Sequence, residues 1–132
     1  MAKSKKVKPE KLLDAVNREL TLYHETVLGR VNQAAKDAVE ELVKKTKATA
    51  PKQTGSYRKN IAGKLKEKKR TGDETYVWYV KAPDYRLTHL LVHGHARVGG
   101  GPPVPGHPFL HNAVDEVRAD FERAVEEAVK DA

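Results

Sequence analysis

One amphipathic pattern near the start of the chain limits its fold more than any other feature. Between residues 13 and 42, apolar or small side chains recur at steps of three or four, the period of one helical face. Pro9 suits the first turn of a helix, and Pro51 disfavours helix in the residue before it. The pattern therefore predicts one long N-terminal helix that fades at residues 48–50. Its apolar stripe consists of Leu13, Val16, Leu20, Tyr23, Val27, Val31, Ala34, Ala38 and Leu42.

This helix is long for a domain of 132 residues. If continuous, it would extend about 60 Å at 1.5 Å per residue, which exceeds the width of such a domain. Either Gly29 divides it in two, or part of its stripe packs on another subunit, and the sequence leaves both readings open. Exposed apolar stripes of this length normally mark interfaces. We therefore expect Leu20, Val27 and Val31 at a contact with another subunit or a neighbouring protein.

The middle of the chain has the pattern of a β-hairpin. Residues at 61, 63 and 65 are apolar or small and alternate with those at 62, 64 and 66, which favours a strand. Residues 71–73 read Thr-Gly-Asp and predict a turn, and residues 75–81 are rich in β-branched and aromatic types. The two segments predict a small antiparallel hairpin. Its first arm is strongly basic, with Lys64, Lys66, Lys68, Lys69 and Arg70.

Two more helices are predicted after the hairpin. Pro83 and Asp84 open a short helix that Gly94 is placed to end. Residues 99–106 hold four glycines and three prolines and form a loop, after which Pro108 starts a C-terminal helix. We expect the core-facing stripe of that last helix to contain Val117, Phe121 and Val125. The order of elements predicts an α+β fold, with one domain at residues 9–132 after a disordered basic arm at residues 1–8.

The composition indicates a soluble protein with an uneven charge distribution. The net charge is +7, but residues 113–132 contain seven acidic and three basic residues, which leaves +11 on the rest. A basic body with an acidic end suits contact between copies or with an anionic partner. There is no cysteine for a disulfide or a thiolate metal site. The longest apolar run, residues 76–80, is too short to span a membrane.

Residues that could carry catalysis do not form a recognisable site. His89 and His93, and again His107 and His111, have a spacing of four that can hold zinc. A catalytic zinc site usually adds a nearby carboxylate, yet Asp84 is the only acidic residue between residues 75 and 114. The glycine run at 99–101 is followed by prolines, which supply no N–H groups for phosphate. We predict no catalytic residue, no metal and no other cofactor, with a metal-dependent enzyme as the third-ranked alternative.

Nucleic-acid binding is the leading alternative function. The basic arm and the basic hairpin carry the charges that contact phosphates. Four aromatic residues of this region could stack on bases if they were exposed; more often such a run places Trp78 in the core. They are Tyr57, Tyr76, Trp78 and Tyr79.

Three segments resemble the neck or tail-component family of siphophages. Residues 50–61 read A-P-K-Q-T-G-S-Y-R-K-N-I, residues 85–96 read Y-R-L-T-H-L-L-V-H-G-H-A, and residues 99–110 form a glycine-rich stretch that ends in P-F-L. Three such motifs in this order and spacing are fairly specific, and the resemblance covers residues 48–117. It departs at Val92, where members commonly carry an acidic residue. The motif residues are Pro51, Thr54, Gly55, Arg58, Tyr85, Leu87, His89, Gly94, His95, Pro108 and Phe109.

The resemblance implies a structural function rather than an enzymatic one. It implies a homo-oligomeric ring that joins the head of a long-tailed bacteriophage to its tail. The implied partners are the portal-side head-closure proteins and the tail terminator or tube proteins, with room for non-specific contact with packaged DNA and no contact with a membrane. The implied location is the neck or tail of the virion, after assembly in the host cytoplasm. The chemistry of these residue types also predicts architectural roles, because glycines permit turns and Pro108 fixes the start of a helix.

Overall fold

A computed structural model describes residues 8–51, 55–94, 96–97, 99–103 and 105–131. The expected basic arm lies outside these residues except for Lys8, and so do Thr54 and His95. Helix α1 spans Leu12–Thr49 without interruption and follows a 3-10 turn at Pro9–Lys11. Its 38 residues extend about 57 Å at 1.5 Å per residue. Gly29 therefore does not divide the helix.

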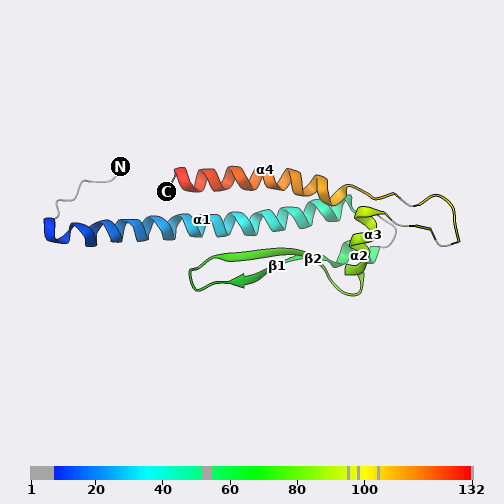
Figure 1. The fold of residues 1–132 in the computed structure, drawn as a ribbon, viewed down its shortest axis with the longest axis horizontal. Coiled ribbons are helices and arrows are strands. Elements are labelled where there is room, and N and C mark those ends of the chain that lie inside the picture. Colours follow the sequence, from blue (N-terminus) through cyan, green and yellow to red (C-terminus); the bar gives the residue numbers. More distant parts are fainter. Residues whose placement is uncertain (1–7, 52–54, 95, 98, 104, 132) are drawn as a thin grey trace.

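The elements form three layers with α1 in the middle (Figure 1). Helix α4, Phe109–Lys130, runs along one side of α1, and the hairpin of β1, Ile61–Lys68, and β2, Glu74–Val80, lies along the other. The strands are antiparallel, with Ile61 opposite Val80, and the register shifts between Leu65 and Glu67. The predicted α+β fold, with a long first helix, a hairpin, a short helix and a last helix, is confirmed.

The hairpin lies against α1 through close packing and two polar contacts. A Cβ added at Gly63 would come within 3.0 Å of Val39 on α1, so the absent side chain allows the strand to approach the helix. Opposite Gly63 in the ladder, Trp78 donates from Nε1 to Thr46 Oγ1 at 2.9 Å. The Trp78 ring is half-buried rather than central to the core, where we had expected it.

The far end of the hairpin is held by Asn32. Its Nδ2 donates to the Gly72 carbonyl at 2.8 Å, and its Oδ1 accepts from the Glu74 N–H at 3.2 Å. One side-chain amide thus takes the place of a backbone partner for the turn. Neither Asn32 nor Thr46 was singled out from the sequence, because a polar residue in a helical pattern does not show which distant group it will bind.

Short elements connect the layers at the end of α1. Helix α2, Gly55–Asn60, precedes β1 where the sequence predicted only a loop up to Gly55 and then a strand. A 3-10 turn at Asp84–Arg86 leads into α3, Leu87–His93. Gly94 follows with a φ of 79°, a conformation that favours glycine, and so ends α3 as predicted.

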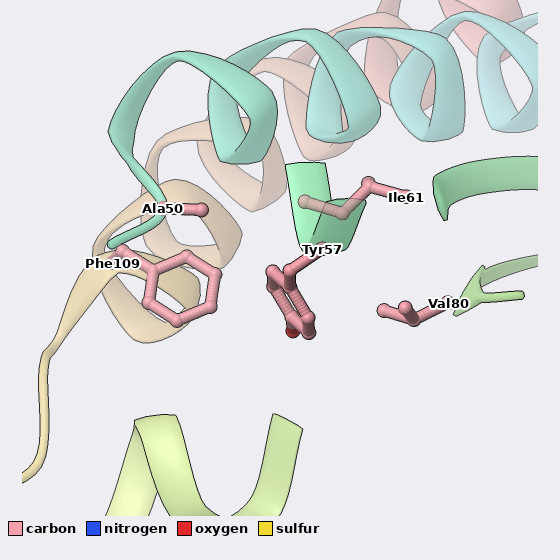
Figure 2. Packing of buried hydrophobic residues seen from close by; sticks show 5 residues of the cluster. All are labelled: Ala50, Tyr57, Ile61, Val80 and Phe109. Atoms are coloured by element: carbon pink, nitrogen blue, oxygen red, sulfur yellow. The ribbon is translucent and has the colours of Figure 1, made fainter. Parts of the chain in front are cut away.

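The main core lies at this same end and contains Ala50, Tyr57, Ile61, Val80 and Phe109 (Figure 2). Along α4, Val117 is buried as expected, but Phe121 and Val125 are only half-buried. Our placement of all three in the core was therefore wrong for two of them. The cause is that α4 beyond its first turn packs mainly on α1, so one flank of its apolar face stays open to solvent.

Candidate functional site

Tyr57 is at the centre of a junction where the three motif segments meet. Its side chain is buried, and its hydroxyl lies 2.7 Å from Thr88 Oγ1 on α3. Its ring meets that of Phe109, the first residue of α4, edge to face with centroids 6.4 Å apart (Figure 2). Burial raises the pKa of Tyr57 above its ordinary value, which keeps the hydroxyl neutral. One residue from each segment therefore contributes to the same packing unit.

Arg58 and Asp84 fix the chain on either side of Tyr57. The guanidinium of Arg58 donates to the carbonyl of Ala50, just beyond α1, with Nε at 3.0 Å and Nη2 as a second donor. Asp84 Oδ2 accepts from Ser56 Oγ and, at 2.8 Å, from Asn60 Nδ2. These charge-assisted bonds tie α2 to the end of α1 and to the turn before α3.

His107 connects the glycine-rich loop to α4. Its backbone N–H donates to the Leu91 carbonyl on α3 at 2.8 Å, and its Nδ1 accepts from the Phe109 N–H at 3.1 Å. The ring thus satisfies one of the N–H groups that the first turn of a helix leaves free. A Cβ at Gly106 would come within 3.0 Å of the Val92 carbonyl, so this position has no space for a side chain.

Three other predicted motif residues border these elements. Pro51 is half-buried and follows the C-cap of α1, Gly55 is the first residue of α2, and Pro108 immediately precedes α4. Their positions suit their types, because each stands where the backbone changes direction.

The remaining motif residues that the structure describes lie on the surface. Tyr85, Leu87 and His89 are exposed, next to the similarly exposed Leu90. The His89 ring lies 4.9 Å from that of His93. Within the described parts of the chain, no three His, Asp or Glu side chains are grouped so that they could hold a metal ion. The motif residues thus divide mainly into an internal junction and a small exposed surface on α3 and the 3-10 turn before it.

The aromatic residues of the hairpin region are not arranged as a stacking surface. Tyr57 is buried in the junction, and the Trp78 indole is turned toward Thr46. Tyr79 is half-buried, and the Lys64 ammonium lies 4.8 Å from its ring centroid. Tyr76 donates to Glu74 at 2.6 Å, an acceptor that raises its pKa. Tyr57 and Trp78, two of the four candidate residues, therefore have rings that are engaged with their own chain, which opposes base stacking.

The N-terminal part of α1 extends beyond both neighbouring layers (Figure 1). Tyr23 donates its hydroxyl to the carbonyl of Val129 at 3.2 Å, which shows where the end of α4 reaches α1. Before this point Leu13 is 71% exposed and Leu20 is 61% exposed. We name residues 12–22 the α1 overhang. Its exposed large apolar residues are Leu12, Leu13, Val16, Leu20 and Leu22.

The three predicted interface residues are thus not equivalent. Leu20 lies on the overhang, whereas Val27 and Val31 are half-buried within their own chain. They follow Tyr23 at helical spacing on the stripe that continues to Ala34, and Ala34 lines a shallow groove together with Ala128 of α4. Substitution of the two valines would therefore also disturb the packing of α1 on α4.

Comparison with known protein families gives a match over most of the chain. Residues 14–97 match the family model described as "Bacteriophage HK97-gp10, putative tail-component". The match takes in almost all of α1, the hairpin, α2 and α3, and leaves α4 outside. No curated protein and no solved structure matches the chain. No helix of the described residues is long and apolar enough to cross a membrane. The matched segment is more than half of the chain, and the chain therefore belongs to the HK97-gp10 family of bacteriophage tail components.

Proposed function

We propose that this chain is a neck or tail-completion subunit that forms a ring and joins the head of a long-tailed phage to its tail. The observation that carries the proposal is the α1 overhang, because its own chain leaves five large apolar side chains of one helix end in solvent. Such a surface is costly in a free protein and suits a contact that forms during assembly. Membership of a tail-component family supplies the setting in which that contact is made.

The ring and its partners follow from this setting. Copies of one chain around the axis of a tail make heterologous contacts that close into a ring. The neighbours along the axis are head-closure or portal-side proteins on one side and tail terminator or tube proteins on the other. The function needs surfaces rather than catalysis, so we propose a non-enzymatic protein of the virion that is assembled in the host cytoplasm.

A loss-of-function experiment tests the joining role. Phage made without this chain should yield filled heads and complete tails that remain separate in electron micrographs. Supplying the chain in trans should restore joined particles. Joined and infectious particles in its absence would contradict the proposal.

The overhang is tested by Leu13→Asp combined with Leu20→Asp. Both side chains are exposed, so the variant should keep the circular dichroism and thermal midpoint of the unchanged chain, yet fail to enter particles. The matched control is Thr26→Asp with Thr49→Asp, which adds the same charges to exposed α1 positions outside the overhang whose hydroxyls bond to their own helix. Normal incorporation of the leucine variant would show that the overhang is not an interface.

A further inference from the structure

The outer face of α4 carries a line of carboxylates that form no ion pair with the described residues. Asp115, Glu122 and Glu126 are exposed and follow one another at steps of seven and four, so they share a helical face. The side chains that α4 buries, among them Ala113 and Val117, point the other way. The ion pairs of α4 within the described residues involve Glu116 and Asp120 instead. We name these three residues the acidic face.

The hairpin carries the opposite charge. Five of its side chains are exposed cations with no ion pair to any described residue. Gly63 and Trp78 lie on the side of the hairpin that packs on α1, so the alternation of a strand directs Lys64 outward. The register shift between Leu65 and Glu67 then turns Lys68 to the side of Glu74, its partner in the ladder, and Glu67 to the outward side. The contacts of Asn32 with Gly72 and Glu74 hold the distal end in place. These five exposed cations surround the distal half of the hairpin and its turn, and we name them together the basic face: Lys64, Lys66, Lys68, Lys69 and Arg70.

These two faces cannot neutralise each other within one chain. The hairpin and α4 pack on opposite sides of α1, which separates them by the full width of a helix (Figure 1). Each face therefore keeps an excess of one charge, although Arg118 lies beside the acidic residues and Glu67 among the basic ones, and this excess attracts a surface of the opposite sign. Each neighbouring copy of the protein carries a surface of the opposite charge.

We propose that the acidic face of one copy contacts the basic face of the next copy. Such a contact joins unlike surfaces, so it is heterologous and repeats around a ring. The positions of the two faces on opposite sides of α1 also leave each copy able to contact two neighbours at once. Complementary charges select the partner face and its register, while apolar contacts elsewhere supply most of the burial. This inference rests on the ring of the proposed function and adds which faces build it.

Crosslinking in assembled particles tests the contact directly. The chain has no cysteine, so Lys66→Cys with Glu126→Cys introduces the only two thiols. A short bismaleimide should then give a ladder of covalent multimers from particles, whereas either single variant should give none. The control pairs Glu126→Cys with Lys44→Cys, an exposed α1 position away from both faces. If the first pair fails to enter particles, Lys68→Cys with Glu122→Cys replaces it. Incorporated chains without a ladder would overturn the inference.

Charge reversal supplies an independent test, because residues with a purely structural role would not show the restoration that we expect from two reversed variants. Lys66→Glu with Lys68→Glu should reduce incorporation into particles at least tenfold, and so should Glu122→Lys with Glu126→Lys. The two variants supplied together should restore it, because acidic hairpins then meet basic α4 helices in alternation. Lys44→Glu with Lys47→Glu, the same change of charge elsewhere on α1, should have no effect.

The possible outcomes separate this inference from the proposed function. Reversals that leave incorporation unchanged would overturn the face assignment, while the ring and the joining role would stand. A hairpin reversal that lowers binding to duplex DNA, and that the α4 reversal does not rescue, would assign the basic face to nucleic acid and also overturn the inference. Heads and tails that join without the chain would contradict the proposed function, whereas the crosslinks would still report which faces meet.

Discussion

Replacing Gly63 with alanine should destabilise the fold, although alanine is usually the better residue in a strand. The new Cβ would lie within 3.0 Å of Val39 Cγ1 and 3.2 Å from Val43 Cγ2. Carbon atoms pack at about 3.5–4.0 Å, so the hairpin must move away from α1 or Val39 must change its rotamer. A valine in a helix has one strongly preferred rotamer, and its backbone is held by the helix on both sides.

The expected cost follows from two opposing effects. Overpacking of this kind costs about 1–3 kcal/mol, and removal of glycine from a strand returns about 0.5–1 kcal/mol. Because the added Cβ would approach Val39 far more closely than carbon atoms pack, the overpacking cost lies in the upper half of that range. We therefore expect Gly63→Ala to lower the free energy of unfolding by about 1–2.5 kcal/mol. Urea denaturation followed by circular dichroism measures this, with the midpoint shifting at constant slope.

Two further variants decide whether the reasoning is right. In the background of Val39→Ala, which removes the obstructing methyl groups, Gly63→Ala should cost much less, and a double-mutant cycle gives the coupling energy. Gly29→Ala is the control, because Gly29 is exposed in α1 with no atom near its missing Cβ; it should stabilise by about 0.5–1 kcal/mol. If Gly63→Ala leaves the free energy of unfolding unchanged, or if its cost is the same in the Val39→Ala background, the hairpin does not approach α1 as closely as we argue.

Three other perturbations follow from the same structure. Phe109→Ala should cost about 3–5 kcal/mol in denaturant unfolding, and Phe121→Ala clearly less, since only Phe109 is buried; equal costs would contradict this. Asn32→Ala should cost about 1–3 kcal/mol for two lost hydrogen bonds and speed amide exchange at Glu74; unchanged exchange would show that the turn does not need Asn32. The raised pKa of Tyr57 predicts that stability falls as pH rises above about 10, because the unfolded chain loses that proton first. Tyr57→Phe should weaken this fall, and an identical pH profile would argue against it.

Periodicity predicted the helices and the hairpin, because each has an apolar face with its own repeat. The continuity of α1 through Gly29 was left open, since one glycine costs only about 1 kcal/mol in a helix, and packing against two layers readily outweighs that. Helix α2 was missed because six residues are too few to show a period, and Gly55 and Ser56 have the composition of a turn.

Burial was harder to predict than secondary structure. Val117 and Phe121 share one helical stripe, yet only Val117 is buried, because burial depends on what lies across from each residue and not on the stripe. The contact of Asn32 with the hairpin turn shows the same limit, since it joins residues 40 and 42 positions apart. The sequence predicted that α1 has more apolar surface than its own chain can cover, and it placed the uncovered part at Leu20, Val27 and Val31. Of these three residues, the structure leaves only Leu20 exposed.

The buried residues of the junction and the surfaces that we propose for assembly lie in different parts of the molecule. Tyr57, Arg58 and Phe109 hold the elements together at the end of α1, where their contacts are all within the chain. The overhang is at the opposite end of α1, and the charged faces lie on its two sides (Figure 1). Substitutions in the junction should therefore act through stability, and those on the outer surfaces through assembly of a folded chain. Because the two effects are separable, a variant that folds normally but is absent from particles identifies an assembly surface.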